Sequence, residues 1–97
     1  MIMINLSETP KIVTIEVTGH GDESDQSCAR VSTVLDCMHL FFKANLKKHK
    51  KSNGYTFIQI SKTAQNQIEL LSVLQYLATL ESLYKKSIKI VNENEVK

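Results

Sequence analysis

The sequence predicts an α+β fold, with a single domain in the order β-β-α-β-α-β and a mixed sheet packed against two helices. Apolar side chains that alternate every second residue indicate short strands, and apolar side chains spaced three or four residues apart indicate two helices. The chain has 97 residues and is 42% hydrophobic, which is enough to bury one core. Nothing in the composition marks a second domain, so we expect residues 1–97 to fold as one unit.

The first element is a predicted β-hairpin over residues 2–18. The segment MIMINL alternates loosely, whereas the segment KIVTIEVTG alternates well and places Val13, Ile15 and Val17 on one face. Turn-forming residues from Ser7 to Pro10 separate the two segments. We therefore expect two antiparallel strands joined by a short turn.

The second element is a predicted amphipathic helix from about Cys28 to about Lys48. One apolar row runs through Val31, Leu35, Met38 and Phe42. Lysines collect towards the predicted end of this helix, where cations offset the helix dipole, and an Asn-Gly turn follows them.

The second half of the chain predicts a strand, a longer helix and a final strand. Tyr55 and Phe57 alternate with Ile58 and Ile60, which is typical of a strand with one buried face. The helix, over about 63–86, is apolar around much of its circumference and therefore needs two neighbours. One would be the sheet, and the other would be the first helix or a second copy of the chain. The segment SIKIV closes the sheet, and the last six residues form a frayed tail.

The composition limits the classes of function. The N-terminus lacks the features of a signal peptide, and no apolar run is long enough to cross a bilayer. Two cysteines in such a chain indicate a reducing compartment, so we expect a cytoplasmic protein without membrane contact. A net charge of +2 does not by itself argue for nucleic-acid binding.

His20 and Cys28 stand at the two ends of one short polar loop. We expect Cys28 in the first turn of its helix, where the positive helix end favours the thiolate and free backbone N–H groups could receive an oxyanion. Gly21 would let the chain turn and leave room for a substrate backbone. The loop is long enough to bring His20 within hydrogen-bonding reach of the thiol.

Other partners for Cys28 are excluded by distance. Cys37 lies about 13 Å further along the same helix and half a turn round, which is too far for a disulfide. His39 lies about 16 Å along the helix, and His49 lies among lysines at its far end. Zinc prefers two close pairs of ligands, and these residues do not supply them, so we expect no metal site. The spacing alone leaves open that Cys28 is a small buried apolar residue.

The Gly-His followed by Cys-Ala-Arg-Val-Ser resembles the ribosomal-processing cysteine protease family, also called Prp. The residues that carry the resemblance are Gly19, His20, Cys28, Ala29, Val31 and Ser32. Length and element order agree as well, so the resemblance spans nearly the whole chain. It implies a cysteine endopeptidase without a cofactor, in the bacterial cytoplasm, with Cys28 as nucleophile and His20 as base. The implied substrate is the N-terminal extension of large-subunit ribosomal protein twenty-seven, removed during ribosome assembly, and the implied assembly is a homodimer.

The resemblance also implies supporting roles around the dyad for Gly19, Ala29 and Ser32, whereas the role of Gly21 rests on its backbone freedom alone. Asp25 matches an aspartate that often precedes the family cysteine. It would either orient His20 or cap the helix, and its residue type prefers the cap. Ser32 lies one turn beyond Cys28 and would line the site or bond back to a helix carbonyl.

A lysine-rich segment carries the alternative function, a non-catalytic module that binds RNA or protein on the ribosome. A solvated helix end is the interpretation that the lysines favour, and no aromatic residues are interleaved with them as in a groove that binds single strands. The lysines that would contact ribosomal RNA are Lys43, Lys47, Lys48, Lys50 and Lys51.

Overall fold

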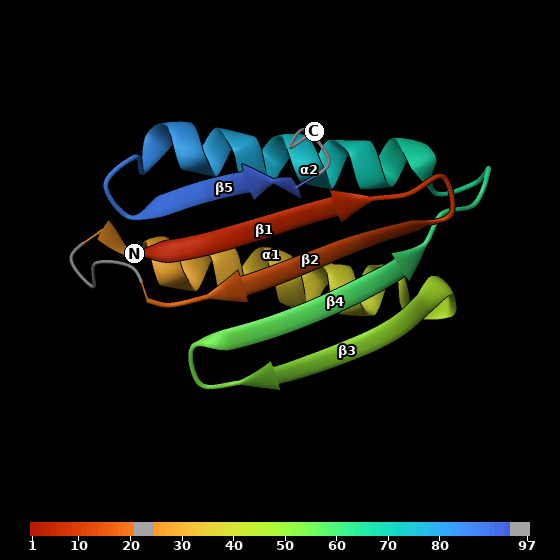
Figure 1. Cartoon of the computed structure of the whole chain (residues 1–97), viewed down its shortest axis with the longest axis horizontal. Helices are drawn as coiled ribbons and strands as arrows, with labels where there is room; N and C mark the ends of the chain where they lie inside the picture. Colours follow the sequence, from red (N-terminus) through yellow and green to blue (C-terminus); the bar gives the residue numbers. More distant parts are fainter. Residues whose placement is uncertain (21–24, 94–97) are drawn as a thin grey trace.

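The computed structural model describes residues 1–20 and 25–93, which form a five-stranded mixed sheet with two helices behind it (Figure 1). This confirms the predicted α+β class. The order along the described residues is β-β-α-β-β-α-β, which is one strand more than the sequence predicted. The elements are β1 (Ile2–Glu8), β2 (Ile12–Thr18), α1 (Ser27–Phe41), the short 3₁₀ helix η2 (Lys43–Asn45), β3 (Leu46–Ser52), β4 (Tyr55–Ser61), α2 (Gln67–Leu83) and β5 (Ile88–Asn92).

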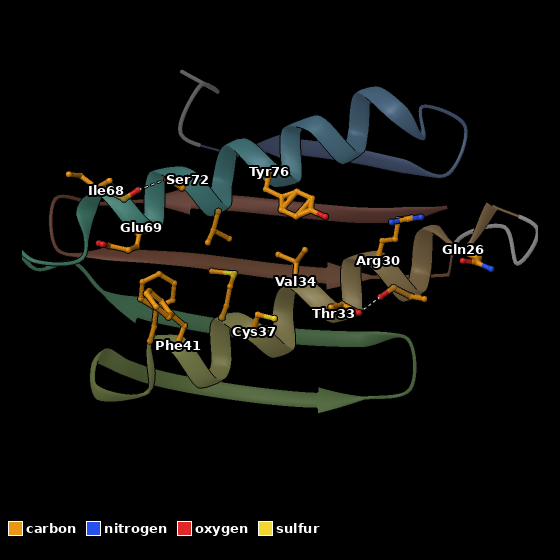
Figure 2. A pocket seen from close by; sticks show the side chains of 14 residues that line it. Gln26, Arg30, Thr33, Val34, Cys37, Phe41, Ile68, Glu69, Ser72 and Tyr76 are labelled. Carbon is orange, nitrogen blue, oxygen red and sulfur yellow. Dashed lines mark hydrogen bonds between the residues drawn. The ribbon is translucent and has the colours of Figure 1, made fainter.

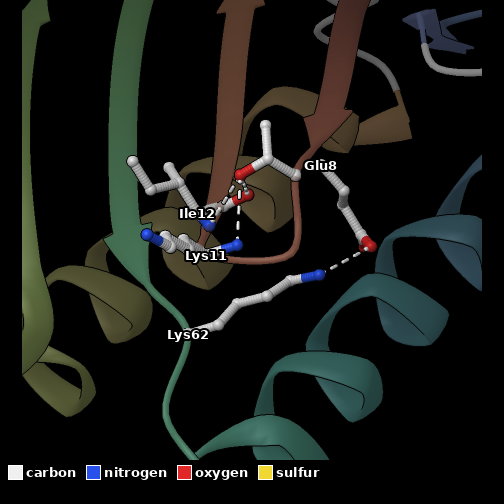
Figure 3. A network of polar contacts seen from close by, with 5 residues as sticks. Glu8, Lys11, Ile12 and Lys62 are labelled. Carbon is white, nitrogen blue, oxygen red and sulfur yellow. Dashed lines mark hydrogen bonds and ion pairs between the residues drawn. The ribbon is translucent and has the colours of Figure 1, made fainter.

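The strands lie side by side in the order β3-β4-β2-β1-β5. Only the β1–β5 pair is parallel among the described strands, because α2 carries the chain back across the sheet before β5 begins. The predicted β1–β2 hairpin is confirmed. At its turn, the Thr9 hydroxyl oxygen accepts the backbone N–H groups of Lys11 and Ile12, and Lys62 bonds the Glu8 carboxylate at 3.2 Å (Figure 3).

The prediction that the first helix continues to about Lys48 is wrong. Helix α1 ends at Phe41, and the lysine-rich segment is the edge strand β3. Of its seven residues only Leu46 and His49 are partly buried, so the segment lacks the apolar alternation that reveals a strand. Exposed lysines and a bulge between Leu46 and Lys48 are features that protect an edge strand from pairing with other chains.

The core lies between the helices and one face of the sheet. Ile4, Ile15 and Ile58 project from the central strands and pack with Met38 of α1 and Leu77 of α2. Burying side chains of this size contributes about 1.5–3 kcal/mol each, which makes this layer the main source of stability. Neither helix in the described ranges is long and apolar enough to span a membrane.

Helix α2 is shorter than the predicted 63–86 segment at both ends, and at its start the Asn66 side chain holds the preceding residues in a turn. Asn66 is buried; its Oδ1 accepts the N–H of Thr63 at 2.9 Å, and its Nδ2 donates to the carbonyl of Ser61 at 2.9 Å. These bonds close a turn ahead of Gln67 and tie it to the end of β4.

Candidate active site

Cys28 is the second residue of α1 and is partly buried against the core. The helix begins directly after Gln26, whose backbone is left-handed with φ of 59°. The backbone N–H groups of this first turn have no partner within the helix. The predicted position of the thiol at a helix start is therefore confirmed.

Asp25 connects the start of α1 to the opposite end of the chain. Its Oδ1 accepts the backbone N–H of Ser27 at 2.9 Å, and its Oδ2 accepts the hydroxyl of Ser87 at 2.5 Å. Ser87 is only 3% exposed, and its carbonyl accepts the N–H of Ile2 at 2.7 Å. The hydrogen bonds from Ser87 and then Ser27 hold the pKa of the Asp25 carboxyl below its usual value, since they favour the charged form.

His20 follows β2 and rests against the turn between β3 and β4. The N–H of Gly19 donates to the carbonyl of Gly54 at 3.0 Å, and both glycines have positive φ. A Cβ on Gly54 would lie 2.8 Å from the Nε2 of His20, so any residue other than glycine would require this imidazole to move. The β3–β4 turn therefore limits where the ring can lie.

A cavity of about 350 Å³ contains both members of the predicted dyad. Gly19 and His20 line it from the end of β2, and Cys28 and Ser32 line it from one face of α1. The other lining residues are Ile2, Val17, Val31, Leu35, Lys51, Ser52, Asn53, Gly54, Tyr55 and Thr56. The cavity thus combines a thiol, an imidazole and an apolar floor.

Two of the other predicted site residues, Ala29 and Asp25, do not line this cavity. Ala29 lines a different hollow, on the other side of α1, and Asp25 is not among the residues that line the cavity. Gly21 falls outside the described residues.

Sequence reasoning missed the wall of the cavity that the β3–β4 turn provides. Residues 51–56 contribute to this wall. Their signal in the sequence was the Asn53-Gly54 pair, which predicts a tight turn but not what the turn faces. Its contact with His20 depends on the pairing of β2 with β4, which places Thr18 beside Tyr55.

The other two histidines form a stacked pair that ties β3 to α1. The rings of His39 and His49 lie 4.1 Å apart at an angle of 15°, and Lys51 bonds Asp36 at 2.9 Å beside them. Burial, then the proximity of His39 and Lys51, lowers the pKa of His49. Within residues 1–20 and 25–93, no three histidine, cysteine or acidic side chains gather as a metal site would require.

A second hollow, which we call the helix groove, lies between α1 and α2 (Figure 2). It has a volume of about 750 Å³. Arg30 stands towards one end and Glu69 towards the other, and Val34 and Tyr76 lie between them (Figure 2). Cys37 is exposed and lines this groove.

Comparison with solved structures identifies the fold. No protein-family model matches the sequence, and a search of curated proteins finds no significant match. The ribosomal processing protease Prp of Staphylococcus aureus, in complex with a covalently linked product peptide, superposes with a TM-score of 0.72 at 22% identity over 96% of this chain and 100% of that chain. The same protease in complex with a substrate peptide gives a TM-score of 0.70 at 20% identity, over 96% of this chain and 100% of that chain. A protein from Streptococcus mutans gives a TM-score of 0.68 at 17% identity, over 95% of this chain and 93% of that chain. The chain therefore has the fold of the ribosomal processing protease Prp.

Proposed function

We propose that the protein is a cysteine endopeptidase that removes the N-terminal extension of large-subunit ribosomal protein twenty-seven in the bacterial cytoplasm. The observation that carries the proposal is that His20 and Cys28 line one cavity, the thiol at the start of a helix and the imidazole at the end of a strand. The shared fold with Prp, whose solved complexes hold a substrate peptide and a covalently linked product peptide, supports it.

The reaction follows from the chemistry of these groups. His20 takes the proton of Cys28, and the thiolate attacks the scissile carbonyl to form a tetrahedral intermediate. Backbone N–H groups in the first turn of α1 stabilise the oxyanion. His20 then gives the proton to the leaving amine, and water, deprotonated by the same imidazole, hydrolyses the thioester and restores the thiol. No cofactor takes part.

The cavity favours a substrate with an apolar side chain beside the cleaved bond. Val17, Val31 and Leu35 form its apolar part, whereas Ser52 and Asn53 are at the turn side. The polar groups of this turn are able to hydrogen-bond the backbone of an extended peptide. Specificity would therefore combine one buried apolar side chain with backbone recognition.

The test is incubation of the protein with the precursor form of ribosomal protein twenty-seven, followed by mass analysis of the products. We expect one cut that releases the N-terminal extension. Cys28→Ala and His20→Ala should remove cleavage while leaving thermal unfolding nearly unchanged. An uncut precursor with the wild-type protein, or cleavage by Cys28→Ala, would refute the assignment.

The alternative, a non-catalytic ribosome-associated module, makes the opposite prediction for the same samples. The precursor would stay intact, and binding to ribosomal RNA would fall steeply with salt and be unaffected by Cys28→Ala.

The proposal includes a homodimer that covers the helix groove. Phe41 and Ile68 flank the groove and are 68% and 77% exposed, and apolar side chains gathered at one hollow mark an interaction site. Glu69 has a buried side-chain oxygen, Oε1, without a hydrogen-bond partner among the described residues. A two-fold axis through the middle of the groove would bring Arg30 of each copy to Glu69 of the other.

Charge reversal tests this interface in solution. The wild-type chain has a mass of 11.0 kDa and should sediment as a dimer. Arg30→Glu and Glu69→Arg should each weaken the dimer, and the combined variant should restore it because both reciprocal pairs form again. A dimer that neither single variant weakens would exclude this arrangement, and so would a wild-type monomer at high concentration.

A further inference from the structure

One face of the sheet is free of helices and carries aromatic and basic side chains together. Both helices pack on the opposite face, so the open face is the one turned towards the reader in Figure 1. Strand residues that alternate with the buried ones point to this face, among them Glu16 of β2 and Phe57 of β4. Sheet register adds Lys48 and Lys50 of β3, which pair with Gln59 and Phe57.

These side chains contact one another across the strands. The ammonium group of Lys48 lies 6.0 Å from the centre of the Phe57 ring. Gln59 donates to the Thr14 hydroxyl at 3.1 Å, and Tyr55 donates to Glu16 at 2.9 Å. The open face therefore presents a partly exposed aromatic ring with exposed lysines on one side and amide and hydroxyl groups on the other.

This arrangement changes the meaning of the lysine-rich segment. Along the chain, no aromatic residue lies among the lysines, which argued against a groove for single strands. The β3–β4 pairing supplies the missing aromatic residue, because it sets Lys50 directly beside Phe57. Lys51 does not take part, since it faces α1 and bonds Asp36.

We propose that the open sheet face, centred on Phe57, Lys48 and Lys50, binds single-stranded RNA. A base would stack on the Phe57 ring in place of the Lys48 ammonium, which would move to a neighbouring phosphate. Lys48 and Lys50 are two residues apart on one strand, about 6.6 Å, so both can reach the backbone of one extended strand. Duplex RNA buries its bases and would lose the stacking contribution.

The face fits RNA better than an acidic protein segment. A carboxylate-rich peptide would use the two lysines but gain nothing from the ring, whereas every base offers a π-face. Glu16 neighbours Phe57 in the β2–β4 register and would repel both kinds of partner. The inference does not depend on protease activity, because Lys48, Lys50 and Phe57 do not line the candidate active-site cavity.

The test measures fluorescence anisotropy of a labelled twelve-nucleotide oligouridine at several salt concentrations. Lys48→Gln/Lys50→Gln should weaken binding about tenfold at low salt and reduce the slope of log affinity against log salt by about 1.4, or 0.7 for each phosphate contact. The matched control, Lys85→Gln/Lys86→Gln, removes the same charge from the segment that follows α2 and should change affinity much less.

Phe57→Leu isolates stacking, because it keeps an apolar side chain and removes the ring. We expect about 5- to 150-fold weaker binding, the range that one stacked base contributes. Phe57→Trp should bind at least as tightly as wild type. If Phe57→Leu unfolds, stacking is tested on the wild-type protein instead. Its affinity for an oligomer of equal charge without bases should be lower than for the RNA by the same factor.

Three results would overturn the proposal. These are equal losses in the two double lysine variants, equal affinity for the RNA and the base-free oligomer, and competition by polyglutamate as strong as competition by unlabelled RNA. The first would place the charge effect outside the open face, and the other two would leave only non-specific attraction between charges. Precursor cleavage by Lys48→Gln/Lys50→Gln is measured in parallel, so that loss of RNA binding and loss of protease activity are distinguished.

Discussion

Helix α1 borders two hollows of different chemistry, the candidate active-site cavity on one side and the helix groove on the other. Cys28 and Ser32 face the cavity, whereas Ala29, Thr33 and Cys37 face the groove. The cavity holds an imidazole and a tight turn, while exposed apolar side chains flank the groove. Nine residues on a helix amount to half a turn beyond two full ones, so the two cysteines lie on opposite sides. The same helix therefore places one thiol in the candidate active-site cavity and the other in the helix groove.

The largest effect should separate the two cysteines. Cys28→Ala should lower precursor cleavage by about 10³-fold or more, because the nucleophile is lost and the remaining groups do not replace it. Cys37→Ala should cleave at the wild-type rate. Iodoacetamide followed by peptide mapping should modify Cys28 before Cys37, and more slowly after His20→Ala. Faster labelling of Cys37 would contradict the assigned nucleophile.

The next effect concerns the turn that supports His20. Gly54→Ala should lower kcat/KM for precursor cleavage by about 10²-fold, because the new Cβ displaces the imidazole and small displacements of a catalytic group are costly. Its positive φ adds strain for alanine, so stability should fall as well.

Gly54→Asn distinguishes displacement of the ring from backbone strain. Asparagine accepts positive φ more readily than alanine but still places a Cβ against His20. We expect its melting temperature to lie closer to wild type while cleavage remains impaired. Recovery of cleavage in Gly54→Asn would show that strain alone caused the loss.

A smaller effect compares two neighbouring hydroxyls on α1. Ser32 lines the cavity, whereas Thr33 donates to the carbonyl of Ala29 at 2.8 Å and lines the helix groove. Ser32→Ala should lower kcat/KM about 3- to 10-fold, comparable with the loss of one hydrogen bond of about 1 kcal/mol. Thr33→Ala should leave cleavage unchanged. Equal effects in steady-state assays of the two variants would show that the Ser32 hydroxyl has no special role in cleavage.

The smallest effect concerns Asp25, whose carboxylate joins the start of α1 to Ser87. The pKa of Asp25 is lowered in the folded protein, so its stabilising contribution is complete above the ordinary value of 3.8 and is lost as pH falls through the lowered value. Asp25→Asn should make the melting temperature depend less on pH in this acidic range. It should reduce cleavage only modestly, because the amide oxygen still accepts the Ser27 N–H. A loss as complete as in His20→Ala would instead place Asp25 in a catalytic triad.

The sequence located the candidate dyad but not its surroundings. The alternation of Val13, Ile15 and Val17 predicted β2 and hence the position of His20 at its end. The apolar row through Val31 and Leu35 predicted α1 and hence the position of Cys28 in its first turn. These signals are local, because the period of the side chains directly reflects the backbone geometry. Both elements are present with nearly the predicted starting points.

Strand β3 shows why the rest could not be predicted. A mostly solvated edge strand carries little apolar alternation, so its lysines suited a helix end equally well. Its conformation is decided by hydrogen bonding to β4 across the Asn53-Gly54 turn, and the same pairing puts this turn against His20. The helix groove likewise depends on how α1 and α2 approach each other.

The sequence by itself therefore determined which segments form the hairpin and begin the first helix, and with them the positions of His20 and Cys28 along the chain. Only the tertiary structure decided that the two side chains share a cavity, that Ala29 faces away from it, and that Phe57 lies beside Lys50. The physical reason is the range of the interactions. Periodicity and turn chemistry are properties of neighbouring residues, whereas cavities and mixed surfaces arise where strand pairing and helix packing join residues that are distant in the chain.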